Sequence, residues 1–108
     1  MTPDPATLRR RLVLEAPVET ADGAGGTVRD HVAVATLWAA LAPRDGRGAS
    51  EADAAGAVVT HRILLRSGPE ITTRHRFRAG TRLFRVIAVR DLDPAGRFLI
   101  VDAEERID

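Results

Sequence analysis

A chain of 108 residues has the length of a single domain, residues 1–108, which buries roughly two-thirds of its unfolded surface. It contains no cysteine and three scattered histidines, so neither a disulfide framework nor the ligand spacing of a zinc site can be assembled. Sixteen basic residues against fifteen acidic ones argue against a dedicated nucleic-acid-binding protein, which would carry a strong basic excess.

The start of the chain lacks the charged and then apolar layout of a signal peptide. No apolar run approaches the ~20 residues that a membrane helix needs. We therefore expect a protein that is made and kept in the cytoplasm, with no membrane partner and with no metal or cofactor.

Residues 7–18 predict a first strand, because Leu12 and Leu14 alternate with charged neighbours. Pro17 marks the end of this strand or an edge position. The glycine turn at residues 22–26 follows, where glycine adopts a positive φ without steric cost and fixes the register of a hairpin. The second strand, residues 28–41, is apolar on both faces, which indicates burial on both sides or a bend in its middle.

Between Pro43 and Gly56 the composition changes to a long loop. Ser50 is a plausible N-cap with Asp53 three residues on, so the loop could contain a short alanine-rich helix that would be marginal in isolation. Loops of this length in a compact domain are usually functional or disordered. Both interpretations stay open: a functional loop and a flexible surface excursion.

Residues 58–67 predict a third strand, with Val59, His61, Ile63 and Leu65 on one face. A histidine among aliphatic residues is a satisfied core or interface residue more often than a catalyst, and no serine, cysteine or carboxylate pattern nearby supplies a partner. A turn at residues 67–69 then leads into a short, polar, arginine-bearing strand over residues 71–77.

A turn at residues 78–81 precedes a fifth strand, residues 82–90, and a strong turn signal at 91–96 precedes a last strand at 98–103 with an acidic tail. In the fifth strand the alternation places two sets of side chains on opposite faces: Phe84, Val86 and Ala88 against Leu83, Ile87 and Val89. Six strands at short spacing predict an all-β fold, a small antiparallel barrel or sandwich.

Every basic residue is an arginine. GC-rich coding would explain this without any function, whereas forked guanidinium contacts to carboxylates and phosphates would suit subunit interfaces or a DNA channel. Residues 62–90 hold eight arginines with Glu70 as the sole acid, and such a local field steers anions without specifying them.

The amino-acid sequence disfavours an enzyme, because it contains no paired carboxylates and no nucleophile with a base beside it. The glycine turn leads into a strand rather than a helix, which is the wrong context for a dinucleotide site. With one tryptophan, three phenylalanines and no tyrosine, the stacking platforms of single-strand binders are mostly missing. Trp38 is interpreted as a core or interface anchor rather than a ligand-stacking residue.

Taken in order, these features resemble the phage head-tail joining family. The chain is similar to head-completion or stopper proteins of long-tailed phages and to their counterpart in a phage-derived gene transfer agent. The resemblance spans nearly the whole chain and depends on the order of its features: Leu8 and Arg11, the turn at 22–26, residues 34–39, Pro43 with Gly46, residues 60–63 with Arg66, Gly80, Phe84, Ile87, Val89, Asp91, and Glu104 with Glu105.

The resemblance implies a β-barrel subunit of a ring, six-fold rather than twelve-fold, in the neck of a particle assembled in the bacterial cytoplasm. Such a ring closes the DNA-filled head beneath the portal or adaptor protein and gives the tail terminator or tail protein a docking surface. Packaged DNA would meet it through transient, non-specific contacts.

Two sets of site residues follow from that expectation. The loop is expected to face the channel through Arg44, Asp45, Arg47 and Glu51. The interfaces are expected to include Trp38, Arg62, Arg66, Arg85, Asp91, Glu104 and Glu105, with opposite charges meeting between subunits. The alternative is a small β-barrel nucleic-acid-binding module, on the strength of the arginines in residues 62–90.

Overall fold

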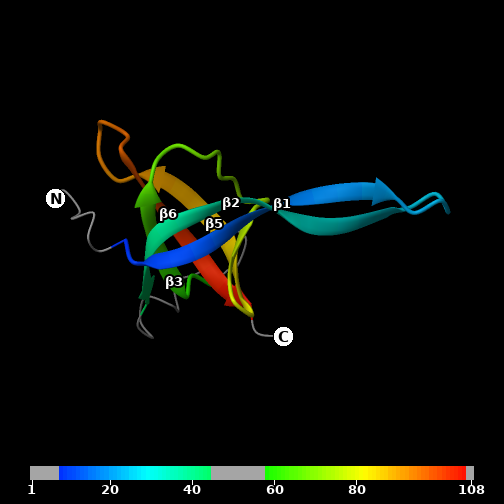
Figure 1. The fold of residues 1–108 in the computed structure, drawn as a ribbon, viewed down its shortest axis with the longest axis horizontal. Helices are drawn as coiled ribbons and strands as arrows, with labels where there is room; N and C mark the ends of the chain where they lie inside the picture. The colour runs from blue at the N-terminus through cyan, green and yellow to red at the C-terminus, as the bar shows by residue number, and fades with distance from the viewer. Residues whose placement is uncertain (1–7, 45–57, 107–108) are drawn as a thin grey trace.

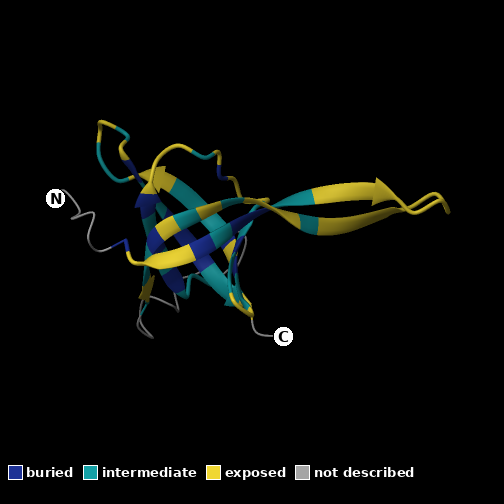
Figure 2. Ribbon diagram, in the orientation of Figure 1, coloured by how far each residue is buried: buried dark blue, intermediate teal, exposed yellow. Residues whose placement is uncertain are grey.

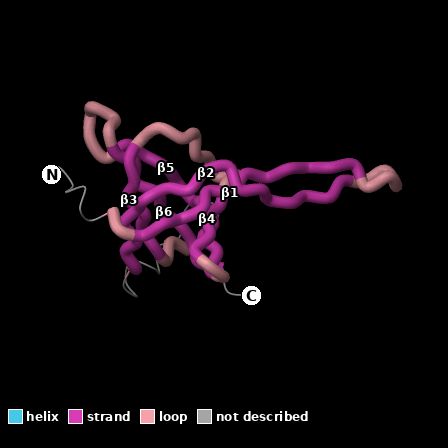
Figure 3. Tube along the Cα trace, in the orientation of Figure 1, coloured by secondary structure: helices cyan, strands magenta, loops and turns pink. Residues whose placement is uncertain are grey.

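The computed structural model describes residues 8–44 and 58–106, and these form a closed antiparallel barrel (Figures 1 and 3). Around the barrel the strands follow the order β1-β2-β3-β6-β5-β4, and the barrel rather than the sandwich is therefore confirmed. The six strands are β1 (Arg10–Ala21), β2 (Thr27–Pro43), β3 (His61–Arg66), β4 (Arg76–Ala79), β5 (Arg82–Asp91) and β6 (Phe98–Arg106).

The inside of the barrel is filled by alternate side chains from every strand, as the period of two requires. Phe77 and Phe84 are its largest fully buried residues and have no exposed surface. The other members of the core are aliphatic: Leu12, Leu14, Ala39, Ile63, Leu65, Ile71, Val86, Val101 and Ala103.

β1 and β2 are longer than the barrel that they help to close. β4 pairs with β1 only over residues 13–15, and β3 pairs with β2 only over residues 39–43. Beyond these points, residues 16–21 and 27–32 pair with each other and with no other described strand. We call this projecting hairpin, residues 16–32, the arm; it gives the molecule a long axis of 52 Å against 29 and 27 Å for the other two (Figure 1).

The tip of the arm is the predicted glycine turn, which the structure confirms. Gly23 and Gly25 have φ of 82° and 86°, a region that other residues enter only with strain. The Asp22 carboxylate accepts hydrogen bonds from the backbone N–H groups of Ala24 (2.7 Å) and Gly26 (3.0 Å), and these bonds lower the pKa of Asp22. The sequence of the turn therefore fixes the register of the whole hairpin.

A β-bulge lies where the arm leaves the barrel. Leu14 pairs with Ala35 but Glu15 pairs with Ala33, so Val34 is an extra residue in β2. Bulges bend a strand and increase its twist, and the predicted bend is thus confirmed. Burial on both sides is wrong, because the four large apolar side chains that lie exposed on β2 are Val28, Val32, Val34 and Trp38.

A second bulge changes the faces of β5. Val86 pairs with Ala103 and Ala88 with Asp102, so Ile87 is the extra residue. Val89 therefore packs against the core on the same side as Phe84 and Val86. The predicted grouping of Ala88 with Phe84, and of Val89 with the opposite face, is wrong, because an extra residue reverses the alternation beyond it.

Several predicted boundaries also need correction. The first strand runs from 10 to 21 rather than 7 to 18, and Pro17 occupies an edge position inside it, beyond the pairing with β4. Residues 71–75 are not a strand: His75 N–H donates to the Thr72 carbonyl in a turn, and β4 begins at 76. The last strand continues to 106, so Glu104 and Glu105 lie within β6 rather than in a tail.

The predicted helical loop, apart from Arg44 at its start, lies outside the described residues. The described residues on either side of it are joined, since Arg44 N–H donates to the Thr60 carbonyl at 2.8 Å. Among the residues that the structure describes, no helix is long and apolar enough to cross a membrane.

The same substitution at two valines tests this description of core and arm. Val86→Ala removes two methyl groups from the core and should lower the free energy of unfolding by about 2 kcal/mol. Val28→Ala on the arm, where the residue is 56% exposed, should change this free energy little. Denaturant titration of the purified chain measures both, and an equal loss for the two variants would contradict the exposed position of the arm.

Candidate functional site

One face of the arm is a continuation of the barrel's core face. On β1 the inward positions Leu12 and Leu14 are followed by Ala16 and Val18 on the same side, because side chains alternate along a strand. The register adds Val32, Asp30 and Val28 opposite Ala16, Val18 and Thr20. Val18, Val28 and Val32 are 41%, 56% and 45% exposed. Figure 2 shows the outer part of the arm as exposed on both strands.

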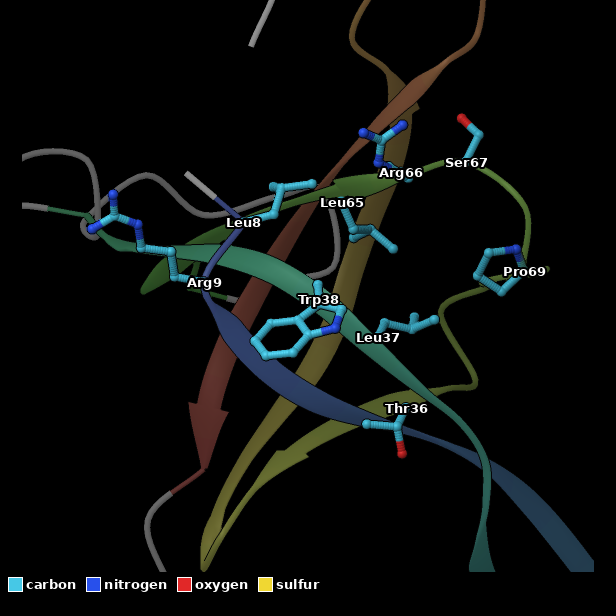
Figure 4. Close-up of a pocket in the computed structure, with 9 residues that line it drawn as sticks. All are labelled: Leu8, Arg9, Thr36, Leu37, Trp38, Leu65, Arg66, Ser67 and Pro69. Atoms are coloured by element: carbon cyan, nitrogen blue, oxygen red, sulfur yellow. The ribbon is translucent and has the colours of Figure 1, made fainter. Parts of the chain in front are cut away.

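A groove of about 790 Å³ opens between the start of β1, the middle of β2 and the loop that follows β3 (Figure 4). Trp38 stands at this groove with 57% of its surface exposed, and the Arg11 guanidinium lies 5.7 Å from its ring centre. The remaining lining residues are Leu8, Arg9, Thr36, Leu37, Leu65, Arg66, Ser67 and Pro69. We call this the Trp38 groove; most of its lining is apolar.

The base of the arm is attached to β4 by a buried carboxylate. Glu15, 6% exposed, accepts hydrogen bonds from Arg76 Nε (2.6 Å) and Arg78 Nε (2.9 Å). Burial alone would raise the pKa of Glu15, but the hydrogen bonds from Arg78 and Arg76 and their charges outweigh it and lower the pKa. Glu15 therefore stays ionised and holds β1 and β4 together.

On the opposite face of the arm from its valines lies a basic cleft of about 390 Å³. Glu19 on this face binds Arg29 of the arm (2.8 Å) and Arg74 of the barrel (3.6 Å). Burial, and then the charge of Arg76, lower the pKa of His31 beside them. The charged and histidine side chains of the cleft are Arg29, His31, Arg74, His75, Arg76, Arg85 and Arg106.

β6 carries two carboxylates that accept hydrogen bonds from arginines of neighbouring strands. Asp102 accepts from Arg90 (2.8 Å) and Arg62 (3.4 Å), and Glu105 accepts two hydrogen bonds from Arg82. The hydrogen bond from Arg82 is the main reason that the pKa of Glu105 is lowered.

His61 is a satisfied residue of the barrel interior, as the sequence predicts. Its Nδ1 lies 2.9 Å from the Thr60 hydroxyl, and its ring meets Phe84 edge to face with centroids 5.1 Å apart. Burial lowers its pKa, and the charge of Glu105 only partly opposes this.

The structure brings some of the predicted interface residues together within the chain. Arg85 Nε lies 4.0 Å from the carboxylate of Glu104, its partner across β5 and β6, and Arg62 pairs with Asp102. Arg66 and Asp91 are exposed, so they are open to a partner. Trp38 is exposed as well, so the alternative that it is a core residue is wrong. The interface roles stay predictions.

Of the four predicted channel residues, the structure describes Arg44 alone. Arg44 lies directly after β2 and is half-buried. Asp45, Arg47 and Glu51 lie outside the described residues, so their channel role stays a prediction.

Sequence reasoning did not single out Glu15, Asp102 or the arm valines. Glu15 and Asp102 look like ordinary outward residues of alternating strands, and only the pairing of strands places two arginines around each. The arm had one signal: the long apolar run over residues 28–41 exceeds what the short strands after it can pair with.

A family model and two solved structures match this chain over most of its length. The family model described as phage head completion protein matches residues 3–106. A chain from the "virion of native gene transfer agent (GTA) particle" is 36% identical, with a TM-score of 0.69 over 94% of this chain and 97% of that one. Protein SF1141 from Shigella flexneri 2a is 25% identical, with a TM-score of 0.71 over 91% and 92%. Among curated proteins none matches this chain.

Removing the buried carboxylate tests the attachment of the arm. Glu15→Gln should lower the free energy of unfolding at neutral pH by about 2 kcal/mol, because hydrogen bonds to two arginines are weakened. A carboxyl whose pKa is lowered on folding stabilises the protein above its ordinary pKa, and this is lost as the pH falls through the folded-state value.

The difference between wild type and Glu15→Gln should therefore shrink on acidification below about pH 4. Denaturant titrations across pH measure it. Glu70→Gln is the matched control, since Glu70 is exposed and pairs with no arginine among the described residues. A Glu15→Gln effect that persists unchanged in acid would contradict the ionic attachment.

Proposed function

Because the chain belongs to the phage head completion protein family, we propose that it forms a ring in the neck of a phage or gene transfer agent particle, where it closes the filled head and joins it to the tail. The family is one of structural virion proteins. The observation that carries the proposal is the family match over residues 3–106, supported by the likeness to a chain of a gene transfer agent virion over nearly the whole length of both.

The surfaces of the molecule support assembly rather than chemistry. A ring of identical subunits needs two different, complementary faces on each copy, since its contacts are heterologous. The arm and the Trp38 groove are two such faces: the arm exposes Val18, Val28 and Val32, and the groove exposes Trp38 beside an apolar lining. Large exposed apolar side chains gathered on one element mark interaction sites.

In the proposed ring the loop between β2 and β3 faces the channel, with Arg44, Asp45, Arg47 and Glu51 as its charged residues. The portal or adaptor protein lies above the ring and the tail terminator or tail protein below it. The ring is six-fold and forms in the bacterial cytoplasm. DNA that passes through it meets weak phosphate contacts only, because tight binding would stall its passage.

The predicted interface residues fit this arrangement unequally. Trp38 and Arg66 flank the groove and offer an aromatic ring and an exposed charge to a neighbour. Arg62, Arg85, Glu104 and Glu105 already have partners of opposite charge within the chain, so their contribution to a subunit contact would be a shared network. Asp91 lies exposed at the end of β5.

The second candidate, a nucleic-acid-binding module, is favoured by one feature, the basic cleft. Each of its arginines has a carboxylate partner: Arg29 and Arg74 with Glu19, Arg76 with Glu15, and Arg85 and Arg106 with Glu104. These partners cancel much of the field that phosphates would meet. We therefore favour the structural ring.

The proposal is tested by removing the protein from an assembling particle. Without it, DNA-filled heads should fail to join tails and should lose DNA, so that tailless heads and separate tails accumulate in electron micrographs. Supplying the wild-type chain should restore joined particles. Particles that assemble and keep their DNA in its complete absence would contradict the proposed function.

A DNA-binding assay separates the two candidates. The purified chain should bind duplex DNA at physiological salt with a Kd no tighter than the ~10⁻⁴ to 10⁻⁶ M of non-specific contacts. Fluorescence anisotropy at increasing salt measures this. Sub-micromolar affinity at physiological salt would favour the nucleic-acid-binding module instead.

A further inference from the structure

We propose that the arm of one copy docks into the Trp38 groove of the next copy, so that each subunit of the ring holds its neighbour by this contact. The inference rests on the proposed function, in which copies of the chain form a ring. It adds which surfaces meet, and three features of the chain carry it: the apolar face of the arm, a groove of matching chemistry and opposite charge, and the direction of the arm.

The first feature is an apolar face with nothing to cover it within the described chain. Val18, Val28 and Val32 lie on the side of the ribbon that forms the core inside the barrel, yet each is more than 40% exposed on the arm. A two-stranded hairpin is at best marginally stable in water and needs a further layer to pack against. The valines of this face therefore present apolar surface that a further layer would cover.

The second feature is the Trp38 groove, an apolar surface on the same chain that matches the apolar face of the arm. The Trp38 groove is lined by the half-buried Leu37 and Pro69 and by the buried Leu8, beside the exposed indole. An aromatic side chain surrounded by apolar surface is the usual centre of a protein interface. An apolar ribbon face is the kind of partner that this groove would accept.

The charges at the two places are opposite. Asp30 lies on the apolar face of the arm, across from Val18, and forms no ion pair with any described residue. Arg66 at the groove is exposed, and its guanidinium lies 5.7 Å from the ring centre of Phe98. Arg11 lies over Trp38 in the same way, and neither arginine has a carboxylate partner in residues 8–44 and 58–106. Such complementarity sets the register of an interface.

The third feature is direction, which points to a second copy rather than to the same chain. The arm and the groove lie on one continuous β1–β2 ladder, and Val28 and Trp38 are ten residues apart on β2, about 33 Å of extended strand. The arm cannot fold back onto its own groove without breaking that ladder. Its length beyond the barrel is comparable with the width of the barrel, so it can reach an adjacent one (Figure 1).

A contact that joins one end of a molecule to a different place on the next is heterologous, and it closes into a ring when the rotation between copies divides a full turn. The same contact repeated around the ring would leave no arm uncovered. The arm face and the groove would then be buried together in every subunit.

Charge reversal tests the pairing in assembled particles. Asp30→Arg and Arg66→Asp alone should each lower the yield of joined, DNA-containing particles by about tenfold or more, because like charges then face each other. The double variant Asp30→Arg with Arg66→Asp should recover most of that yield, since the pair is restored with its signs exchanged. Thr27→Arg is the matched control on the opposite face of the arm and should leave the yield unchanged.

Cross-linking provides a second readout that does not depend on yield. The chain has no cysteine, so Val28→Cys in one population and Ser67→Cys in another are the only thiols that this protein contributes. Co-assembled particles treated with a bismaleimide should give a dimer of the two variants. Thr27→Cys with Ser67→Cys should give much less of the cross-linked dimer, because Thr27 lies on the opposite face of the arm.

The outcomes separate the inference from the proposed function. If wild-type protein is required for joining but both single charge variants are neutral, or the double variant stays defective, the inference is overturned and the function stands. Cross-linking of Val28→Cys to a portal, adaptor or tail protein instead of a second copy also overturns it. If the wild-type protein is dispensable for joining, the proposed function itself fails.

Discussion

The alternation of side chains along β1 and β2 is the constraint on which the rest of the structure depends. Within the barrel it points Leu12, Leu14 and Ala39 into a closed core. The same alternation continues beyond the barrel, where it places the apolar side chains of Val18 and Val28 on the corresponding face. There they are exposed to solvent. The barrel half of the β1–β2 ribbon buries its apolar face, whereas the arm half exposes it. An exposed apolar face of this kind is typical of an interaction site. In the proposed ring, the neighbouring copy is that partner.

The arginines mostly serve the fold. Glu15, Asp102 and Glu105 each bind at least one arginine on a neighbouring strand, and these pairs lie across the seams β1–β4, β3–β6 and β5–β6. A guanidinium suits these places because it makes forked, planar contacts with a carboxylate. The internal pairing also opposes the positive field of a surface that carries many arginines.

Much of the fold follows from local sequence. The glycine turn, the number of strands and the inward face that holds His61 can all be derived, because each depends on turn chemistry or on a period of two over a few residues. The bulges at Val34 and Ile87 could not be derived, since one inserted residue changes every face beyond it and leaves no local mark. The exposure of the arm had one signal, the length of the apolar run over residues 28–41. The valine pattern itself cannot show whether a third strand lies beside it.

Hydrogen exchange read by mass spectrometry tests the central claim, that the arm is an unfinished part of the core that assembly completes. Peptides from residues 16–32 and 33–38 are compared between the isolated chain and the intact particle. The account predicts fast exchange in the arm of the isolated chain and marked, simultaneous slowing in both peptides within the particle. Arm amides that exchange equally fast in both states would contradict it.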